Sequence, residues 1–310
     1  MKIIIFGIGS IGRRYAYILR HNFTRDIIAF RSKEQDHFTS NVRQTVHTWD
    51  QVKRCRPEVA FITNPTFMHI KTALKCASLN MHLYIEKPLS HNLNGVDKFA
   101  EVCRRKKLAC YTAYAFRFHP VIQLIRKLLK RKTIYHARVI CSSYLPRWRK
   151  DANYKKYYSV SSNKGGGVIL DLSHELDYIS FLFGQIRSIN GTYGRASSIT
   201  IDAEDYMDAS IVTSNNVYVN LHLNYFSLCE ERKIIVDFKN GYITGDLRKN
   251  RVEYCYNNVK KVFTFAVNRN DVLKKQITYF LDNLKKHSMM NNITESRRLI
   301  RKIQEFKHGR

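Results

Sequence analysis

Four ionisable side chains crowd one short apolar stretch in the middle of the chain. The stretch "GGGVILDLSHELDY" runs from Gly165 to Tyr178 and carries Asp171, His174, Glu175 and Asp177. On a single helix, Asp171 would have His174 three and Glu175 four residues ahead of it, on one face. The positive end of a helix dipole disfavours imidazolium, and a neutral imidazole can accept a proton from an alcohol. The pattern fits two readings: His174 as an acid–base group oriented by Asp171, or a buried pair that only braces the helix.

A second chemical signal lies in the first twelve residues. The motif Gly7-x-Gly9-x-x-Gly12 follows a short apolar run and opens a helical pattern. The first glycine permits a tight turn, the second lets a pyrophosphate approach the backbone, and the third lets helix and strand pack closely. The helix N-terminus then offers unpaired N–H groups to the phosphates. This predicts a dinucleotide site rather than a glycine-rich turn without a ligand, and its residues are Gly7, Gly9, Ser10, Ile11, Gly12 and Arg13.

The end of the second expected strand indicates which dinucleotide is bound. NAD sites usually place an acidic residue there to bind the ribose 2′-OH, whereas this chain reads Phe30-Arg31-Ser32-Lys33. A carboxylate would repel a 2′-phosphate, but Arg31 and Ser32 would bind one. The sequence therefore favours NADP over NAD as the cofactor. The alternative is that Arg31 is a surface residue.

Two further strands are expected to end at Asn64-Pro65 and at Glu86-Lys87-Pro88. In parallel sheets, ligands bind beyond the carboxyl ends of the strands. Lys87 is therefore expected at the nicotinamide end of the site, where it could bind a substrate hydroxyl or take part in proton transfer. The alternative is a surface lysine before a turn proline.

The elements that would position these groups differ between the two halves of the chain. Up to residue 118, apolar β-branched runs alternate with helical patterns, which predicts a doubly wound parallel sheet, the Rossmann dinucleotide-binding domain. Residues 119–310 predict an α+β domain with an open, mainly antiparallel sheet. Its strands are expected at 135–143, 186–193, 206–213, 216–223, 232–237, 242–246, 251–256 and 259–265, and its last helices at 272–286 and 294–306.

Composition sets limits on the partners. The chain has 310 residues, 53 Lys and Arg, 25 Asp and Glu, and a formal net charge of +28. The basic residues are dispersed without a helix-turn-helix or zinc-finger signature, so nucleic acid is disfavoured, and part of the charge would attract an anionic small substrate. No targeting segment, membrane partner or metal site is expected, since apolar runs are short and the seven cysteines lack CxxC spacing. Scattered thiols suggest a cytoplasmic protein.

Taken together, the segments "IIIFGIGSIGRR", "TNPTFMH", "YIEKPLS", "YAFRFHP" and "GGGVILDLSHELDYISFLFG" resemble the Gfo/Idh/MocA family of NAD(P)-dependent sugar and polyol oxidoreductases. The resemblance implies hydride transfer to or from a sugar carbon that bears a hydroxyl or keto group. It implies a homodimer or homotetramer built on the open sheet. It also implies Lys87, Asp171 and His174 as the catalytic residues, and adds Asn64, Pro65, His69, Glu86 and Lys87 to the cofactor-binding set.

The chain departs from the family at one point. Many members space the last pair as D-x-x-x-H, whereas His174 here follows Asp171 by three residues and Glu175 takes the fourth place. Either the helix starts differently, or Glu175 enters the site. The family also includes non-catalytic regulators that bind the cofactor, which is the second hypothesis for this chain.

Substrate contacts are expected beside these groups. The stretch before the glycines resembles a bacterial subgroup associated with surface-polysaccharide or nonulosonic-acid sugar synthesis. Its aromatic and cationic side chains suit a sugar that carries a phosphate, nucleotide or carboxylate. The alternative is a packed connecting loop. The predicted substrate-binding residues are Arg117, His119, Arg149, Tyr158 and His174.

Overall fold

The computed structural model describes residues 1–32, 40–148, 153–286 and 289–309. The chain divides into two compact units. Unit 1 comprises Met1–Tyr114 and Leu273–Ile300, and unit 2 comprises Ala115–Val272 and Arg301–Arg310. This division differs from the predicted boundary after residue 118, because a late segment returns to the first unit. The reason is packing: Phe280 lies against the rings of Phe61 and Tyr84, at centroid distances of 6.2 and 5.4 Å.

Unit 1 contains a six-stranded sheet in which every strand pair is parallel, in the order β3-β2-β1-β4-β5-β6. This confirms the predicted doubly wound sheet. The strands are β1 (Ile3–Phe6), β2 (Ile27–Phe30), β3 (Gln44–Val46), β4 (Val59–Ile62), β5 (His82–Ile85) and β6 (Cys110–Thr112). The helices are α1 (Ser10–Asn22), α2 (Trp49–Cys55), η1 (Thr66–Met68), α3 (His69–Ser78) and α4 (Val96–Arg105), joined by α8 (Arg269–Asp282) from Leu273 onward and by α9 (Ile293–His308) up to Ile300.

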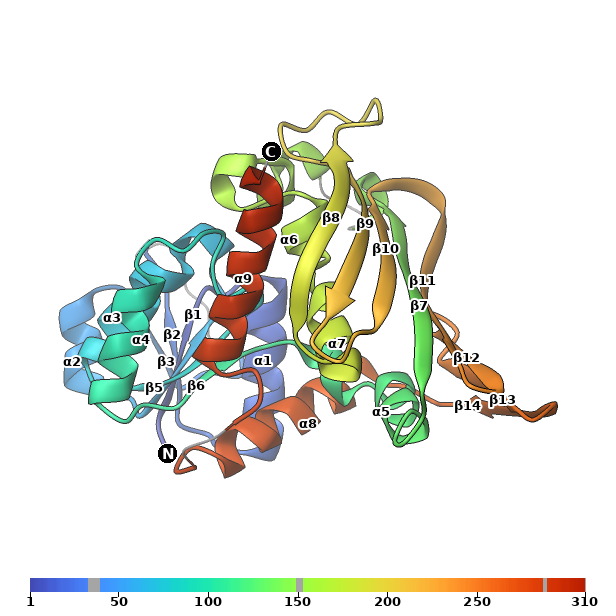
Figure 1. Cartoon of the computed structure of the whole chain (residues 1–310). Coiled ribbons are helices and arrows are strands. Elements are labelled where there is room, and N and C mark those ends of the chain that lie inside the picture. Colours follow the sequence, from blue (N-terminus) through green and yellow to red (C-terminus); the bar gives the residue numbers. More distant parts are fainter. Residues whose placement is uncertain (33–39, 149–152, 287–288, 310) are drawn as a thin grey trace. The chain divides into compact units, whose positions relative to one another are not determined.

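Alternation along the strands explains the layers of unit 1. Successive side chains of a strand point to opposite faces of its sheet. Ile4 and Phe6 of β1 belong to the core that also contains the buried side chains of α2, α3 and α4. Figure 1 shows these three helices together beside the sheet. Tyr15 of α1 contacts the rings of Phe61 and Tyr84, and those rings also contact α8. Both faces are therefore covered, which is why the strands read as nearly continuous apolar runs.

The segment from β3 to α2 has no counterpart in the sequence prediction. β3 has only three residues, and α2 has seven. α2 is fixed locally by a capping box, in which the Thr48 side chain accepts from Gln51 N while the Gln51 side chain accepts from Thr48 N. Its first residue, Trp49, stacks on Phe6 at 5.1 Å. Trp49 also contacts the ring of Phe30, at a centroid distance of 5.6 Å. Both elements are too short to show an apolar period in the sequence.

Unit 2 contains an eight-stranded sheet in the order β14-β13-β12-β11-β7-β10-β9-β8. The strands are β7 (Ile134–Tyr144), β8 (Ile186–Gly194), β9 (Tyr206–Thr213), β10 (Tyr218–Asn224), β11 (Phe226–Phe238), β12 (Gly241–Asp246), β13 (Arg251–Tyr256) and β14 (Val259–Thr264). Only β7 and β10 pair in parallel, and all other strand pairs are antiparallel. This confirms the predicted open, mainly antiparallel sheet.

Short helices precede and cover this sheet. They are η2 (Ala115–Phe118), α5 (Pro120–Leu128), η3 (Leu145–Arg147), η4 (Tyr154–Lys156), η5 (Tyr158–Val160), η6 (Ser162–Lys164), α6 (Val168–Asp171) and α7 (Ser173–Phe183). α5 packs against β12 and β13, and α6 packs against β9 and β10.

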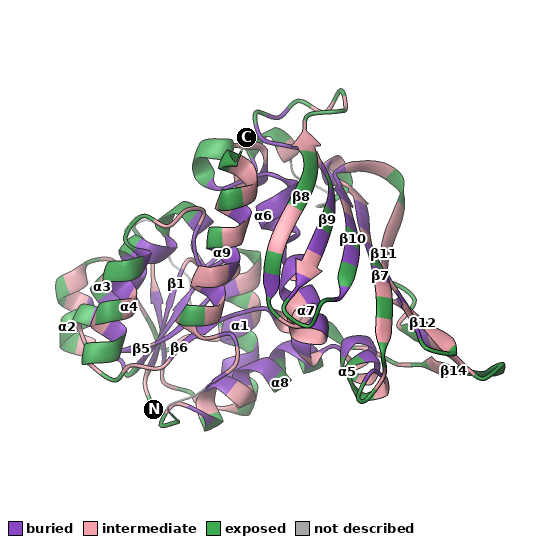
Figure 2. Cartoon of the chain, in the orientation of Figure 1, coloured by how far each residue is buried: buried purple, intermediate pink, exposed green. Residues whose placement is uncertain are grey.

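One face of the unit 2 sheet remains open. Along β9, Met207, Ala209 and Ile211 are buried, whereas Asp208 and Ser210 between them are exposed. Figure 2 shows mixed burial on β8 to β10, in contrast to β1, β4 and β6 of unit 1, which are buried throughout. Such period-two alternation is typical of an antiparallel sheet with one solvated face. Among the residues that the structure describes, no helix combines the length and apolar character needed to span a bilayer.

Candidate functional site

The glycine loop of unit 1 has the geometry that the motif predicts. Gly7 has a φ of +97°, and a Cβ built there would lie 2.5 Å from Asn64 N. A Cβ on Gly12 would lie 2.1 Å from the Gly7 carbonyl oxygen and 2.8 Å from Thr63 Oγ1. At Gly9, in contrast, no described heavy atom lies within 4 Å of the Cβ position. Gly7 and Gly12 therefore fill crowded places, and Gly9 leaves the open backbone position that a pyrophosphate would need.

The helix that follows this loop is electrostatically suited to an anion. α1 starts at Ser10, and no side chain of the described chain caps its N-terminus. Its first turn contains no acidic residue that would neutralise the positive dipole end. Arg13 lies in that turn, and its Nε donates to the Ile8 carbonyl oxygen at 3.4 Å. The N-terminus thus combines uncapped backbone N–H groups with a cation, as a phosphate site does.

Asn64 adds an unused acceptor directly beside the glycine loop. Its Nδ2 donates to Thr72 Oγ1 at 2.8 Å. Its Oδ1 is buried and has no hydrogen-bond partner among the described residues. A buried acceptor without a donor is costly, so this atom is poised for an N–H or O–H group of a ligand. Together with the space above Gly9, it shows that the residues present fit a dinucleotide.

His69 connects the two strand ends at which the motifs lie. The ring is 1% exposed, with Nδ1 2.9 Å from the Pro88 carbonyl oxygen and Nε2 2.9 Å from that of Asn64. Burial lowers its pKa to about 4, although both carbonyls favour the charged form. A neutral ring has one N–H and can donate to one of the two carbonyls at a time. His69 therefore braces the loops after β4 and β5, and its predicted contact with the cofactor stays a prediction.

The loop after β5 is fixed from α1. Tyr15 is fully buried, and its hydroxyl donates to Glu86 Oε1. Lys87 N donates to Glu86 Oε2 at 3.3 Å, and the Lys87 side chain is half-buried. Pro88 follows through a cis peptide bond. The Glu86 carboxylate thus fixes the loop itself, and the predicted contact of Lys87 with a ligand stays a prediction.

The predicted 2′-phosphate subsite is only partly described. Arg31 is half-buried, and Ser32 is exposed. The Arg31 backbone is fixed to the neighbouring strand, because its N–H donates to Val46 O at 3.0 Å and its carbonyl lies 2.9 Å from His47 Nδ1. Lys33 lies outside the described residues. The preference for NADP therefore stays a prediction.

In unit 2 the predicted single helix is in fact two. α6 ends at Asp171, Leu172 adopts φ −95° and ψ 23°, and α7 begins at Ser173. Asp171 therefore does not share one continuous helix with His174 and Glu175, and its predicted pairing with His174 stays a prediction. Two phenols contact its carboxylate: Tyr158 Oη lies 2.9 Å from Oδ1, and Tyr225 Oη lies 2.8 Å from Oδ2.

The other two carboxylates of this stretch are bound by arginines. Glu175 is fully buried, and Arg232 on β11 binds it through Nε at 2.6 Å and Nη2 at 3.0 Å. Asp177 is bound through Arg117 Nε at 3.0 Å and Nη2 at 2.8 Å. Bidentate pairs of this kind fix orientation as well as charge. The two ion pairs attach α7 to β11 and to η2. This accounts for the presence of Glu175 and Asp177 on an otherwise apolar helix.

The predicted substrate-binding residues have different surroundings. Arg117 is 5% exposed and is committed to Asp177, and this favours a bracing role. His119 caps α5, because its Nδ1 accepts from Val121 N, and burial together with Arg232 lowers its pKa to about 4. Both side chains are thus used within unit 2, and their contact with substrate stays a prediction. Arg149 lies outside the described residues.

His174 is half-buried at the start of α7. Its ring lies 4.6 Å from that of Phe116, measured between centroids, with an interplanar angle of 64°. Sequence reasoning did not single out Phe116, Tyr225 or Arg232. Arg232 lies in the charged run "CEERK" of a strand, which reads as a solvated edge. A local pattern does not show that this side chain turns towards a buried carboxylate.

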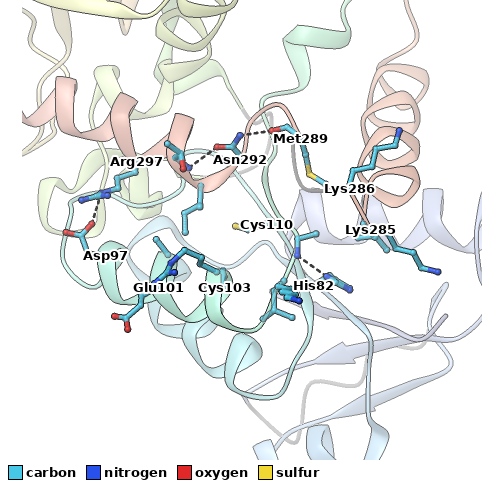
Figure 3. Close-up of a pocket in the computed structure, with 18 residues that line it drawn as sticks. His82, Asp97, Glu101, Cys103, Cys110, Lys285, Lys286, Met289, Asn292 and Arg297 are labelled. Atoms are coloured by element: carbon cyan, nitrogen blue, oxygen red, sulfur yellow. Dashed lines mark hydrogen bonds and ion pairs between the residues drawn. The ribbon is translucent and has the colours of Figure 1, made fainter.

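Unit 1 also contains a cavity of about 880 Å³ between α4 and the segment that joins α8 to α9. Figure 3 shows Cys103 and Cys110 towards its middle and Arg297 bound to Asp97 at one end. His82 and Cys110, which line it, begin strands β5 and β6. The motif residues follow the carboxyl ends of strands, so this cavity is distinct from the predicted cofactor site.

Comparison with protein families gives two matches that together cover most of the chain. Residues 1–114 match the oxidoreductase family with an NAD-binding Rossmann fold, GFO/IDH/MocA. Residues 122–244 match the GFO/IDH/MocA C-terminal domain. The two matches lie in the same order as the two sheets described above.

Curated relatives match over part of their length. An uncharacterised oxidoreductase of Synechocystis is 27% identical over 136 residues, which are 43% of this chain and 37% of that protein. The 2,7-anhydro-N-acetylneuraminate hydratase of Mediterraneibacter gnavus is 20% identical over 194 residues, or 61% of this chain and 51% of that protein. The chain thus spans about a third to a half of the length of these relatives.

Solved structures match over the whole chain. UDP-N-acetylglucosamine 3-dehydrogenase from Acidithiobacillus ferrooxidans has a TM-score of 0.83 and 18% sequence identity, and the match covers 99% of this chain and 96% of that one. At this identity the likeness shows the fold. Since both domain families match in sequence, and the glycine loop has the geometry of a dinucleotide site, the chain belongs to the Gfo/Idh/MocA family of NAD-binding oxidoreductases.

Proposed function

We propose that this protein is an NADP(H)-preferring oxidoreductase that transfers a hydride between nicotinamide and a hydroxyl or keto carbon of a modified or activated sugar. The observation that carries the proposal is the glycine loop, with its open position at Gly9 and its uncapped helix N-terminus. A dinucleotide site needs an open backbone position and free N–H groups of this kind, whereas a strand-to-helix turn without a ligand needs neither.

The chain's own residues would hold the cofactor at three points. Backbone N–H groups from Gly7 to Gly12 would bind the pyrophosphate, Asn64 Oδ1 would accept from a cofactor donor, and Arg31 with Ser32 would bind a 2′-phosphate. When bound, a nicotinamide dinucleotide supplies or takes up a hydride at C4 of its ring. If Arg31 is the 2′-phosphate ligand, it gives NADP its advantage over NAD.

The proton chemistry is assigned to Lys87 and His174. The Lys87 ammonium would donate a hydrogen bond to the reacting oxygen of the sugar, which favours the developing alkoxide. His174 would take the hydroxyl proton during oxidation and return it during reduction. Asp171, bound by Tyr158 and Tyr225, would keep its carboxylate in one place for this imidazole. The two groups belong to different units, and their action on one substrate is part of the proposal.

The substrate class is inferred from relatives and charge. Two similar proteins are named for a neuraminate derivative and for UDP-N-acetylglucosamine, which supports a modified or nucleotide-activated sugar. A role in cell-surface polysaccharide synthesis is the further proposal from the resemblance of the sequence. The net charge of +28 favours a sugar that carries a carboxylate, phosphate or nucleotide. Arg149 and Tyr158 remain candidate contacts, and a homodimer or homotetramer remains the proposed assembly.

The test is cofactor absorbance. Purified protein is mixed with NADPH or NADH and a panel of keto-sugars and nucleotide sugars, and oxidation is followed over time. Turnover should be lost in Lys87→Ala and in His174→Ala, but retained in the exposed controls Lys98→Ala and His21→Ala. Unchanged turnover in both site variants would overturn the catalytic assignment. Tight cofactor binding with no turnover on any sugar would favour the regulatory protein instead.

A further inference from the structure

The ion pair between Arg232 and Glu175 lies next to the proposed acid–base group. Arg232 is on β11, opposite Cys141 of β7, and Glu175 directly follows His174 on α7. Both carboxylate oxygens are engaged, at 2.6 and 3.0 Å, and Tyr178 Oη lies 3.3 Å from Oε1. A guanidinium fork that binds both oxygens of a carboxylate fixes its orientation. Glu175 is thus engaged by Arg232 and Tyr178, and it is not the group to which we assign the proton transfer.

Phe116 gives Arg232 a second connection to His174. The Arg232 Cζ atom lies 4.3 Å from the centre of the Phe116 ring. The His174 ring lies 4.6 Å from the same ring centre. One aromatic side chain thus contacts both the guanidinium and the imidazole. Movement of Arg232 would be passed to His174 along the chain through Glu175 and across space through Phe116.

The other charged groups around α7 are already matched. Asp177 on α7 is paired with Arg117 on η2, and Asp171 on α6 is bound by Tyr158 and Tyr225. His119 at the start of α5 has a pKa of about 4, lowered by burial and by Arg232. Among these described groups of unit 2, His174 is half-buried, and the proposed function assigns it the acid–base role.

We propose that Arg232 and Glu175 are positioning residues for His174, which they orient through their bidentate ion pair and through the shared Phe116 ring. The proposal rests on the proposed function, because it assigns Arg232 and Glu175 a role in the same reaction. It also answers the question raised by the shortened spacing: Glu175 braces the imidazole, and His174 remains the acid–base group. Arg232 is thus added to the site by tertiary structure alone.

The kinetic test compares four proteins. Arg232→Met alone would leave a buried carboxylate unpaired and endanger folding, so the informative variant is the double replacement Glu175→Met/Arg232→Met. The second variant, Arg232→Lys, keeps the charge and loses the fork. The control is Arg138→Met, which removes an exposed ion pair of the same two strands, with Asp237 at 3.3 Å. We expect kcat to fall about 100-fold in the double variant, as for a catalytic group misplaced by about 1 Å, with KM for NADPH unchanged. Arg232→Lys should restore part of kcat.

A second readout does not depend on turnover. The Phe116 ring current displaces the imidazole proton resonances of His174, which are identified by their loss in His174→Ala. The chemical shifts of these resonances should change in the double variant and in a Phe116→Leu reference. They should stay unchanged in Arg138→Met. If no sugar of the panel supports NADPH oxidation by the wild type, the proposed function fails. The resonance measurement then still tests whether Arg232 and Glu175 position His174. A folded double variant with wild-type kcat and unmoved His174 resonances would overturn the inference.

Discussion

Replacement of Gly12 by alanine tests the packing role of the third glycine of the motif. The added Cβ would lie 2.1 Å from the Gly7 carbonyl oxygen and 2.8 Å from Thr63 Oγ1, whereas ordinary contacts are 3.4–4 Å. The first neighbour is backbone and cannot rotate away, so α1 and the glycine loop must separate by more than 1 Å. Overpacking of this kind costs about 1–3 kcal/mol, and we expect the upper end of that range for Gly12→Ala.

Gly9→Ala is the matched variant, because it adds the same methyl group where no described atom lies within 4 Å. Its stability should fall by no more than about 1 kcal/mol, the usual difference at a helix N-cap. The methyl group would instead occupy the space through which a pyrophosphate approaches. Loss of one charge-assisted hydrogen bond, about 1.5–3 kcal/mol, weakens binding about 10–100-fold.

Urea unfolding measures the first effect, and titration of NADPH fluorescence measures the second. The two variants should separate stability from cofactor affinity. Gly12→Ala should lower the free energy of unfolding, and Gly9→Ala should lower the affinity for NADPH while remaining folded. A Gly12→Ala protein as stable as the wild type would refute the packing argument. A Gly9→Ala protein that binds NADPH as tightly as the wild type would refute the placement of the pyrophosphate.

Three other changes have defined outcomes. Arg117→Met leaves the buried Asp177 carboxylate without its cation and should lower the free energy of unfolding by about 3–5 kcal/mol. Arg138→Met, which breaks an exposed ion pair, should lower it by less than about 1 kcal/mol. Equal losses of stability in urea unfolding would contradict this prediction. Because the pKa of His69 is lowered in the folded protein, only the unfolded chain gains a proton on this ring as the pH drops from 6.5 to 4. The free energy of unfolding should therefore fall by about 3 kcal/mol over this range, at 1.36 kcal/mol per pH unit. His69→Gln should flatten this dependence of stability on pH. Tyr225→Phe removes one of two donors to Asp171 and should lower kcat about 10-fold with little change in KM, a split that steady-state kinetics would detect.

The first unit was almost fully predictable because its signals are local. Each strand is buried on both faces and therefore reads as a short apolar run, and each turn carries glycine, proline or asparagine. The three motif glycines are recognisable from their spacing, but the crowding that requires them at Gly7 and Gly12 comes partly from Thr63 and Asn64 at the end of a neighbouring strand. The exceptions are β3 and α2, where three strand residues and a capping box leave no periodic pattern.

The second unit shows where local pattern fails. An apolar period predicts one helix after the glycine triplet, but the helix breaks at Leu172. The partners of the three carboxylates in this stretch also come from other elements of the fold. Asp171 is bound by tyrosines, and Glu175 and Asp177 by arginines, from positions up to 60 residues away.

The sequence by itself determined the two sheets, the dinucleotide loop and the candidate residues for the proposed chemistry. Those features follow from backbone sterics and from the burial of apolar side chains, which act over a few residues. Only the tertiary structure decided which carboxylate is committed to which cation, and it added Arg232, Phe116 and Tyr225 to the surroundings of His174 and Asp171. Charge pairing is decided by proximity in space. The sequence of β11 does not indicate that Arg232 will meet the Glu175 carboxylate of α7.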